Sequence, residues 1–399
     1  MIDVAIIGGG PAGVAAALQL KRRGVGRVAI LEREENLGGV PRHCGHPPFG
    51  MHEFGRVLTG PAYARRLAVA AEAAGIEILH RHSVVGLRPG GVLEVATPEG
   101  RLELRALRVL LATGARESPR AARLLGGDRP LGVLNTGALQ AHVFLHGTTP
   151  FRRPVVVGTE LVSLSSLATC RGHGIRPVAV LEQGKRAVAR WPLTVFPRLL
   201  RIPVYYGTEI SEIRGAERVE SVLLRDGREI TCDGVLLTGH FVPEASLARM
   251  GHLAMDAGSG GPVTDQYGRC SDAAYFAAGN VLRGIETAGW SFREGTAIAD
   301  YIADDLAGGL PYAEGAVEVL CGEGLKYALP QALARVAKLR GVMQLRVAEP
   351  MRGQLRVRAG EAVLYRRRLA VLPERRILLD LENIKLTNGV SQIIVELVA

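Results

Sequence analysis

The sequence has few residues that could cross-link it covalently. Its five cysteines (Cys44, Cys170, Cys232, Cys270 and Cys321) are odd in number, widely scattered and form no CxxC pair. This pattern argues against structural disulfides and against a thiol–disulfide couple of the CxxC type. It predicts a reducing, cytoplasmic setting.

Long hydrophobic runs are also missing. No apolar run reaches the roughly 18 residues that a membrane helix needs. The apolar residues from Val4 have no basic leader before them and no cleavage site after them, so they do not resemble a signal peptide. We expect no transmembrane segment, and any membrane association would come through partner subunits.

Aromatic residues make up only 5% of the chain, whereas the formal net charge is +10. The excess arginine is spread along the sequence, with one short cluster at Arg366–Arg368. Because few aromatic residues are interleaved with it, we do not expect nucleic-acid binding. The 399 residues, 47% of them apolar, can bury a substantial core and should divide into two or three domains.

A nucleotide-binding pattern begins a few residues into the chain, in VAIIGGGPAGVAAALQLKRRGVGRVAILERE. A short apolar strand over Val4–Ile7 leads into a GxGxxG turn and a helix from about Ala12 to Arg23. The next strand, Arg27–Leu31, ends at Glu32. Glycines in the turn let backbone N–H groups approach a pyrophosphate, and the acid can bind a ribose diol. The unit predicts a dinucleotide site.

Three more motifs follow in order. ENLGGVPRHCGHPPFG contains Gly38-Gly39, LRVLLATGARESP contains Ala112-Thr113-Gly114, and AAYFAAGNVLRGIETAGWSFREG contains Gly279-Asn280. In this combination they resemble the two-dinucleotide-binding-domain flavoproteins, the group of glutathione reductase, thioredoxin reductase and NADH oxidase. The resemblance covers about residues 1–312 and implies FAD as the cofactor. The residues it implies for FAD binding are Gly8, Gly10, Pro11, Ala12, Gly13, Glu32, Arg33, Gly39, Val84, Thr113, Gly114, Gly279 and Asn280.

The last of these motifs departs from the group, which has GD where this chain has Gly279-Asn280. An asparagine can still hydrogen-bond a ribityl hydroxyl, but without charge. Ser291 and Glu294 then have the spacing of a capping box, which predicts a helix to about Ala307, ended by Gly308-Gly309. In the resembling fold this helix points its N-terminus at the flavin. The alternative is a surface helix that simply needs a cap.

A second, imperfect copy of the nucleotide unit begins at Pro154. Gly158 and Glu182 are separated by the same 24 residues as Gly8 and Glu32, which places Glu160 where the first copy has Gly10. A carboxylate there would repel a pyrophosphate by roughly a kcal/mol or more. We therefore doubt ordinary NAD(P) binding, and expect a degenerate scaffold that is open to another ligand or to a contact between subunits. Ser163, in place of Gly13, is small enough to be tolerated.

Cys44 and His46, in PRHCGHPPFG, are the candidate catalytic residues. Related flavoproteins place a redox cysteine near this position, and His43 and His46 could lower the pKa of the thiol. The disulfide reductases have a second cysteine five positions on, where this chain has Phe49. A small buried thiol without a role in turnover is the alternative. A metal site from these histidines and Cys44 would lack a fourth ligand.

The longer segment GGVPRHCGHPPFGMHEFGRVLTGPAYARRL has a closer resemblance, which extends to the C-terminus. It is similar to a bacterial family of FAD-binding subunits found beside glycerol-3-phosphate-dehydrogenase-like flavoproteins. FAD subunits of opine oxidases, hydrogen cyanide synthase and dye-linked proline dehydrogenases are more distant relatives. The resemblance implies a multi-component dehydrogenase, in which other flavoprotein or iron–sulfur subunits would be the partners. After about residue 312, apolar and polar residues alternate, which predicts about four short strands.

Together these patterns predict an α/β fold with two Rossmann-like three-layer units of the glutathione and thioredoxin reductase type, plus a small C-terminal β-rich domain. The FAD-binding domain would be discontinuous, over residues 1–118 and 245–312. The NAD(P)-binding-like domain would cover 119–244 and the β-rich domain 313–399. The function would be that of an FAD-dependent dehydrogenase subunit that oxidises a small polar substrate or relays electrons. The alternatives are a self-sufficient NAD(P)H-dependent flavoenzyme using Cys44 and a non-catalytic, FAD-bearing assembly subunit.

Overall fold

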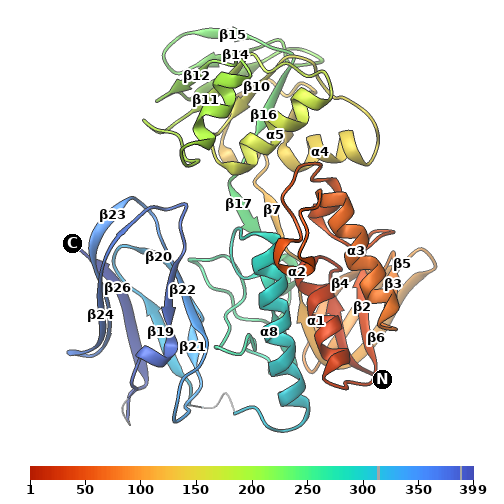
Figure 1. The fold of residues 1–399 in the computed structure, drawn as a ribbon, viewed down its shortest axis with the longest axis vertical. Helices are drawn as coiled ribbons and strands as arrows, with labels where there is room; N and C mark the ends of the chain where they lie inside the picture. Colours follow the sequence, from red (N-terminus) through yellow and green to blue (C-terminus); the bar gives the residue numbers. More distant parts are fainter. Residues whose placement is uncertain (312–314, 387–388) are drawn as a thin grey trace. The chain divides into compact units, whose positions relative to one another are not determined.

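The computed structural model describes residues 1–311, 315–386 and 389–399. They form two compact units (Figure 1). The first unit contains Met1–Leu37, Leu67–Ala115 and Pro243–Ala399, and the second contains Gly38–Arg66 and Arg116–Val242. The chain therefore passes between the units several times.

The first unit is built on a parallel sheet whose strands are short, apolar and buried. Strand β1 (Ile2–Ile7) lies at its centre, and the order is β3-β2-β1-β6-β18. The other strands are β2 (Val28–Glu32), β3 (Glu77–His80), β6 (Gly100–Leu111) and β18 (Tyr275–Ala277). Strands β4 (Ser83–Arg88) and β5 (Val92–Thr97) continue from β6 as an antiparallel meander.

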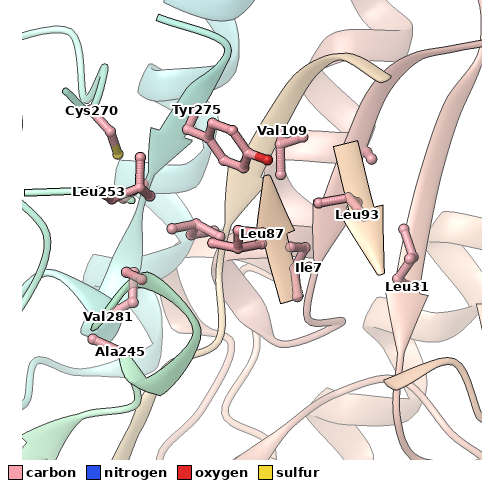
Figure 2. Close-up of a cluster of buried hydrophobic side chains, with 14 of the residues drawn as sticks. Ile7, Leu31, Leu87, Leu93, Val109, Ala245, Leu253, Cys270, Tyr275 and Val281 are labelled. Carbon is pink, nitrogen blue, oxygen red and sulfur yellow. The ribbon is translucent and has the colours of Figure 1, made fainter. Parts of the chain in front are cut away.

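Two helices pack together in this unit. They are α1 (Pro11–Arg22) and α8 (Ala288–Leu306), which lie side by side in Figure 1. A Cβ placed on Gly295 of α8 would lie 2.1 Å from the carbonyl oxygen of Ala12, so the helices meet backbone to backbone. A hydrophobic cluster packs between the parallel sheet, the meander and the segment 245–282. It includes Ile7, Leu93, Val109 and Tyr275, which are shown in Figure 2.

The second unit repeats this arrangement. Its parallel sheet has the order β12-β11-β10-β16-β9, with β10 (Pro154–Val157) at the centre. The other strands are β9 (Val133–Asn135), β11 (Ala179–Glu182), β12 (Val204–Tyr206) and β16 (Gly234–Leu237). A smaller sheet contains β8 (Gly126–Gly127), β13 (Ile210–Arg214), β14 (Ser221–Leu224) and β15 (Glu229–Thr231). The helices are α2 (Met51–Phe54), α3 (Gly60–Ala73, which ends in the first unit), α4 (Thr136–Phe144), α5 (Leu161–Gly172) and α6 (Phe196–Leu199).

The predicted internal repeat is thus confirmed in the fold. Helices α1 and α5 each have 12 residues and each follows the central strand of its sheet. The doubled Rossmann-like α/β architecture and the C-terminal β-rich part are both as the sequence predicts. Strands β7 (Ala115–Glu117) and β17 (Phe241–Pro243) pair where the chain leaves and re-enters the first unit, and α7 (Ser246–Met250) follows.

The C-terminal part has eight strands in the described residues, twice the predicted number. One sheet has the order β21-β19-β26-β23-β24 and the other β20-β22-β25. The strands are β19 (Val317–Cys321), β20 (Leu325–Leu329), β21 (Ala332–Leu333), β22 (Val342–Val347), β23 (Met351–Ala359), β24 (Ala362–Val371), β25 (Ile377–Asp380) and β26 (Gln392–Val398). The four predicted strands correspond to β22 to β25, and the prediction missed β19, β20, β21 and β26. Strand β20 ends in three consecutive buried residues, Tyr327–Leu329, so it lacks the alternation on which the prediction depended.

The compact units are divided differently from the three predicted domains. The C-terminal strands belong to the first unit, because Tyr327 and Leu329 enter its main hydrophobic cluster and Thr264 bonds to Gln331. Residues Gly38–Arg66 belong to the second unit, where a Cβ on Gly45 would overlap the Phe144 ring. The predicted boundary at 312/313 lies outside the described residues.

The contact between Gly295 and α1 gives a stability prediction. In Gly295→Ala the new methyl group would overlap the Ala12 carbonyl, which is backbone and cannot move independently. We expect a loss of about 2 kcal/mol from overpacking and a fall in Tm of about 5 °C. The control is Gly172→Ala near the end of α5, where no atom lies within 4 Å of the added carbon. Thermal unfolding of both variants measures the difference, and an unchanged Tm for Gly295→Ala would contradict the packing.

Candidate functional site

The predicted FAD residues of the first unit meet at one edge of its parallel sheet. Strands β2, β1, β6 and β18 are adjacent and parallel, and their carboxyl ends carry Glu32, Gly8, Thr113 and Gly279. Backbone hydrogen bonds join these strand ends. Ala112 N–H donates to the Ile7 carbonyl at 2.9 Å, and Ala278 N–H donates to the Leu111 carbonyl at 3.0 Å. Ligands of open α/β sheets bind at this edge.

The turn between β1 and α1 has the features of a phosphate cradle. Gly8 has φ +107°, and a Cβ on Gly13 would lie 2.0 Å from the Gly8 carbonyl oxygen, so only glycine fits. Helix α1 begins after Gly10 with Pro11 in its first turn, and no side chain caps its N-terminus. The free dipole end of a helix attracts phosphate. These residues fit the pyrophosphate of FAD.

Glu32 is held in position by backbone donors. It is buried, and its carboxylate accepts from Gly9 N–H at 2.9 Å and from Glu34 N–H at 3.0 Å. At the next strand end, Thr113 Oγ1 donates to the Glu244 carbonyl at 2.6 Å and Gly114 accepts from Glu244 N–H. Hydrogen bonds therefore hold both Glu32 and the Thr113-Gly114 turn in place. Bound FAD would supply the redox chemistry, and these residues would hold its adenosine and phosphates.

The last motif departs from the prediction in detail. Helix α8 begins four residues earlier than predicted, because its N-cap is Thr287 and not Ser291; the Thr287 hydroxyl accepts from Trp290 N–H. The predicted Ser291/Glu294 capping box is wrong, because Glu294 accepts from Gly279 N–H at 2.7 Å and pairs with the buried Arg283. Asn280 hydrogen-bonds the backbone of Glu286 through both ends of its amide. Its role toward a ribityl hydroxyl stays a prediction.

The remaining predicted residues lie in different places. Arg33 is mostly exposed and approaches Glu34 at 3.7 Å, and Val84 lies half-buried on β4 against the main hydrophobic cluster. Gly39, with φ +58°, Cys44 and His46 all lie in the second unit. His46 Nδ1 lies 3.0 Å from the Pro47 carbonyl oxygen. The FAD-binding roles of Arg33, Val84 and Gly39 also stay predictions.

The corresponding edge of the second unit is occupied by its own glutamate. Glu160 precedes α5, and its carboxylate accepts from the Thr238 hydroxyl at the end of β16. A Cβ on Gly158 would lie 2.6 Å from one carboxylate oxygen, and a Cβ on Gly239 2.5 Å from the other. The carboxylate thus lies over the loop where a phosphate would enter. Burial raises the pKa of Glu160, with the Thr238 bond opposing the shift.

The rest of this edge keeps the form of a nucleotide site. Glu182 is buried and accepts from Gly184 N–H at 2.8 Å and from the Thr159 hydroxyl, as Glu32 does from its own loop. Ser163 fits in place of Gly13 because its hydroxyl donates to the Gly158 carbonyl at 2.8 Å. The departure from the first unit is therefore centred on Glu160.

Cys44 lies in a buried polar cluster that the sequence did not predict. Its sulfur lies 3.5 Å from Gln140 Oε1 on α4, and Glu117 is close enough to affect its charge. Burial, with a smaller effect of Glu117, raises the pKa of the Cys44 thiol to about 12. This is opposite to the lowering expected from His43 and His46, so Cys44 is a weak candidate for a thiolate nucleophile.

Glu117 is the residue that sequence reasoning missed. It is 7% exposed and accepts from Gly137 N–H at 2.8 Å in the first turn of α4, where the buried Thr136 is also close. Burial raises its pKa to about 7, although the Gly137 bond lowers it. The only signal in the sequence is a carboxylate shortly after the ATG motif, and nothing near it predicts that α4 will bury it.

Metal sites and membrane-spanning helices are the two remaining features to consider. Residues 1–311, 315–386 and 389–399 contain no group of three or more His, Cys, Asp or Glu side chains that could hold a metal ion. In the same ranges no helix combines the length and apolarity needed to cross a bilayer.

Comparison with known proteins gives a consistent family. Residues 2–295 match the family described as pyridine nucleotide-disulphide oxidoreductase. The ferredoxin reductase component of chlorobenzene dioxygenase from Cupriavidus sp. is 27% identical, over 73% of this chain and 68% of that protein. The alpha subunit of sarcosine oxidase from Rhizobium meliloti is 28% identical, over 82% and 33% respectively. One subunit of opine oxidase from Agrobacterium tumefaciens is 26% identical, over 70% and 61%.

Solved structures support the fold. Thioredoxin reductase from T. acidophilum superposes with a TM-score of 0.62 at 22% identity, covering 76% of this chain and 98% of that one. The predicted likeness to subunits of opine oxidase and hydrogen cyanide synthase is confirmed. The chain spans about a third of the sarcosine oxidase relative and about two thirds of the other two relatives.

The first cradle can be tested by giving it the glutamate of the second. In Gly10→Glu a carboxylate would enter the phosphate approach, and repulsion of roughly a kcal/mol or more adds to steric exclusion. We expect protein that purifies without its yellow colour. Gly309→Glu, which adds the same charge at an exposed position after α8, should keep its FAD. Absorbance at purification measures FAD content, and a yellow Gly10→Glu protein would refute the assignment.

Glu117 predicts a pH dependence of stability. Because its folded pKa is raised, its contribution to stability is fully present below the unfolded pKa of 4.5 and is lost as pH rises through about 7. A shift of this size corresponds to about 3 kcal/mol. In urea unfolding between pH 5 and 8, wild-type protein should lose stability as pH rises, and Glu117→Gln should lose less. Parallel profiles would contradict the burial of this carboxyl.

Proposed function

Because the chain belongs to the pyridine nucleotide-disulphide oxidoreductase family and is an FAD-dependent oxidoreductase, we propose that it is the FAD-bearing subunit of a multi-component dehydrogenase or oxidase. Electrons would reach its FAD from a small polar substrate or a partner protein, and not from NAD(P)H bound at the second Rossmann-like unit. Other flavoprotein or iron–sulfur subunits would be its partners.

The observation that carries this proposal is the position of the Glu160 carboxylate. It lies against Gly158 and Gly239 and is bonded to Thr238, so it fills the turn that would otherwise hold a pyrophosphate. Burial raises its pKa, which reflects the cost of a charge at this place. NAD(P)H would have to displace the side chain and bring a second negative charge to the same turn. Both requirements weaken binding.

The environment of Cys44 supports the same conclusion. A thiol that attacks peroxide or a disulfide acts as the thiolate. Burial and Glu117 raise the pKa of Cys44 to about 12, so its thiolate fraction at neutral pH is very small. The alternative of a self-sufficient NAD(P)H-dependent enzyme using Cys44 and His46 therefore lacks both its electron donor and its nucleophile.

The residues of the first unit would have separate tasks in this reaction. Bound FAD would accept the electrons. Glu32 would hold the ribose of its adenosine, the first turn of α1 would hold the pyrophosphate, and the Gly279-Asn280 turn would lie beside the ribityl chain. The uncharged asparagine leaves this turn without the carboxylate of the related GD motif.

The substrate class is suggested by the relatives. Sarcosine oxidase and opine oxidase, to judge by their names, oxidise small amino-acid derivatives. We propose a substrate of this kind, with a glycerol-3-phosphate-like substrate as the alternative that follows from the predicted neighbouring flavoproteins. Because the chain spans only part of these relatives, the complete assembly would provide the remaining elements of the reaction.

The test compares wild-type protein with two variants of Glu160. Wild-type protein should show no tight NADH binding and negligible flavin reduction by NADH. Glu160→Gly should gain both in part, because Gly158, Glu182 and α5 are already arranged for a nucleotide. NADH should be favoured over NADPH, since Glu182 repels a 2′-phosphate. Anaerobic titration followed at the flavin absorbance band measures both properties.

Glu160→Gln is the matched control, because it removes the charge but keeps the side chain over the loop. A gain in Glu160→Gly alone would indicate that the filled space excludes the nucleotide. A gain in both variants would indicate that the charge does. Wild-type NADH binding in the low micromolar range would show that Glu160 moves aside, and the proposed electron path would then be wrong.

A further inference from the structure

The segment between β18 and α8 carries the Gly279-Asn280 turn and is held from two sides. On one side, both backbone groups of Gly279 are bound by side chains. Its N–H donates to Glu294 at 2.7 Å, and its carbonyl accepts from Arg283 at 3.1 Å. Arg283 is 1% exposed and forms a bidentate pair with Glu294. This side of the turn is fixed within the FAD-binding part of the chain.

On the other side, the turn is closed by Asn280 and Glu286. The Asn280 amide donates to the Glu286 carbonyl at 3.1 Å, and its oxygen accepts from Glu286 N–H at 2.8 Å. The loop from Asn280 to Glu286 is thereby cross-linked at its base. The position of Asn280 therefore depends on the position of Glu286.

Glu286 is held by the C-terminal strands. Its carboxylate side chain is 6% exposed and accepts from Arg346 on β22 at 2.8 Å and from Arg376, which directly precedes β25. The Arg376 guanidinium also lies 4.0 Å from the centre of the Trp290 ring, in the first turn of α8. Two arginines from one sheet thus bind both the loop and the start of the helix that follows it.

These contacts are of the kind that fixes geometry. Hydrogen bonds between ionised partners are stronger than neutral ones. A carboxylate that is 6% exposed would be left with an uncompensated charge if both arginines were removed, and with only one of its two partners if one were. The Gly279 end of the loop is equally constrained, since a Cβ there would lie 2.9 Å from Ala12 Cβ in the phosphate cradle.

We propose that Glu286, Arg346 and Arg376 form a clamp through which the C-terminal β-rich segment positions the Gly279-Asn280 turn for FAD. Glu286 is a positioning residue that acts through Asn280 and makes no contact of its own with the cofactor. This role is independent of the electron donor, so it does not rest on the function proposed above. It gives the C-terminal strands a task in cofactor binding.

The experiment uses two variants that change the charge in opposite directions. Glu286→Gln removes a negative charge from the clamp and Arg376→Gln removes a positive one. Both break the same interaction. If the clamp acts by position, each variant should raise the FAD dissociation constant by about tenfold, measured by reconstitution of the apoprotein. Each should also shift the flavin absorption band in the same direction, because the turn is displaced in both.

The midpoint potential of the flavin gives a second readout, which a loss of general stability would not move. If both variants displace the turn, the midpoint potential should shift with the same sign in both.

Glu318→Gln is the control, because Glu318 lies on β19 of the same segment and pairs with Gln392. It should bind FAD as wild type does. Arg376 is the more exposed partner, at 30%, so Arg376→Gln decides the matter if Glu286→Gln does not fold.

Two results would overturn the proposal. FAD dissociation constants within twofold of wild type in the folded variants would show that the turn does not depend on the clamp. If the FAD dissociation constant or the midpoint potential changes in opposite directions in the two variants, the flavin responds to the charge of these residues and not to the position of the turn. Neither result depends on NADH or on a substrate, so failure here is separate from failure of the proposed function.

Discussion

The close approach of helix α1 to its neighbours is the constraint on which the FAD edge depends. Its first turn lies so near the Gly8 carbonyl that position 13 must be glycine, and so near α8 that position 295 must be glycine as well. These contacts bring the uncapped end of the helix to the carboxyl ends of four strands. The phosphate cradle, the ribose acid and the Gly279-Asn280 turn are therefore placed by backbone packing.

The second unit has the same fold without a glycine at the position that corresponds to Gly13. Ser163 replaces the glycine, and its hydroxyl donates to the Gly158 carbonyl. The acid at the end of β11 keeps its hydrogen bonds, and the strand order is repeated. One glutamate occupies this loop without a change in architecture, because its carboxylate lies against Gly158 and Gly239 and accepts from the Thr238 hydroxyl.

Local patterns in the sequence were enough to predict β1, α1, β2, β10 and β11, and with them the doubled unit. GxGxxG, its distorted copy and the 24-residue spacing describe contacts that are made within one βαβ unit. The failures concern partners that are distant in the chain. Glu294 has the spacing of a capping box but binds Arg283 and Gly279, and Asn280 bonds to a backbone six residues away. Glu117 is buried by a helix that begins near residue 136, and Glu286 is held by strands some 60 and 90 residues later. No periodicity in the sequence records such contacts.

The two parallel sheets take their fifth strand from different parts of the chain, and this affects the order in which the sheets can be completed during synthesis. In the second unit β9 precedes the other strands of its sheet, whereas in the first unit β18 follows the whole of residues 116–242. During synthesis from the N-terminus, the second unit can complete its parallel sheet while the first still lacks one strand and helix α8. The FAD edge becomes whole only when residues 275–306 have emerged, and its loop clamp only after residue 376. Binding of FAD at this edge would therefore come late in synthesis, and until then the apolar surface that β18 and α8 cover would stay exposed.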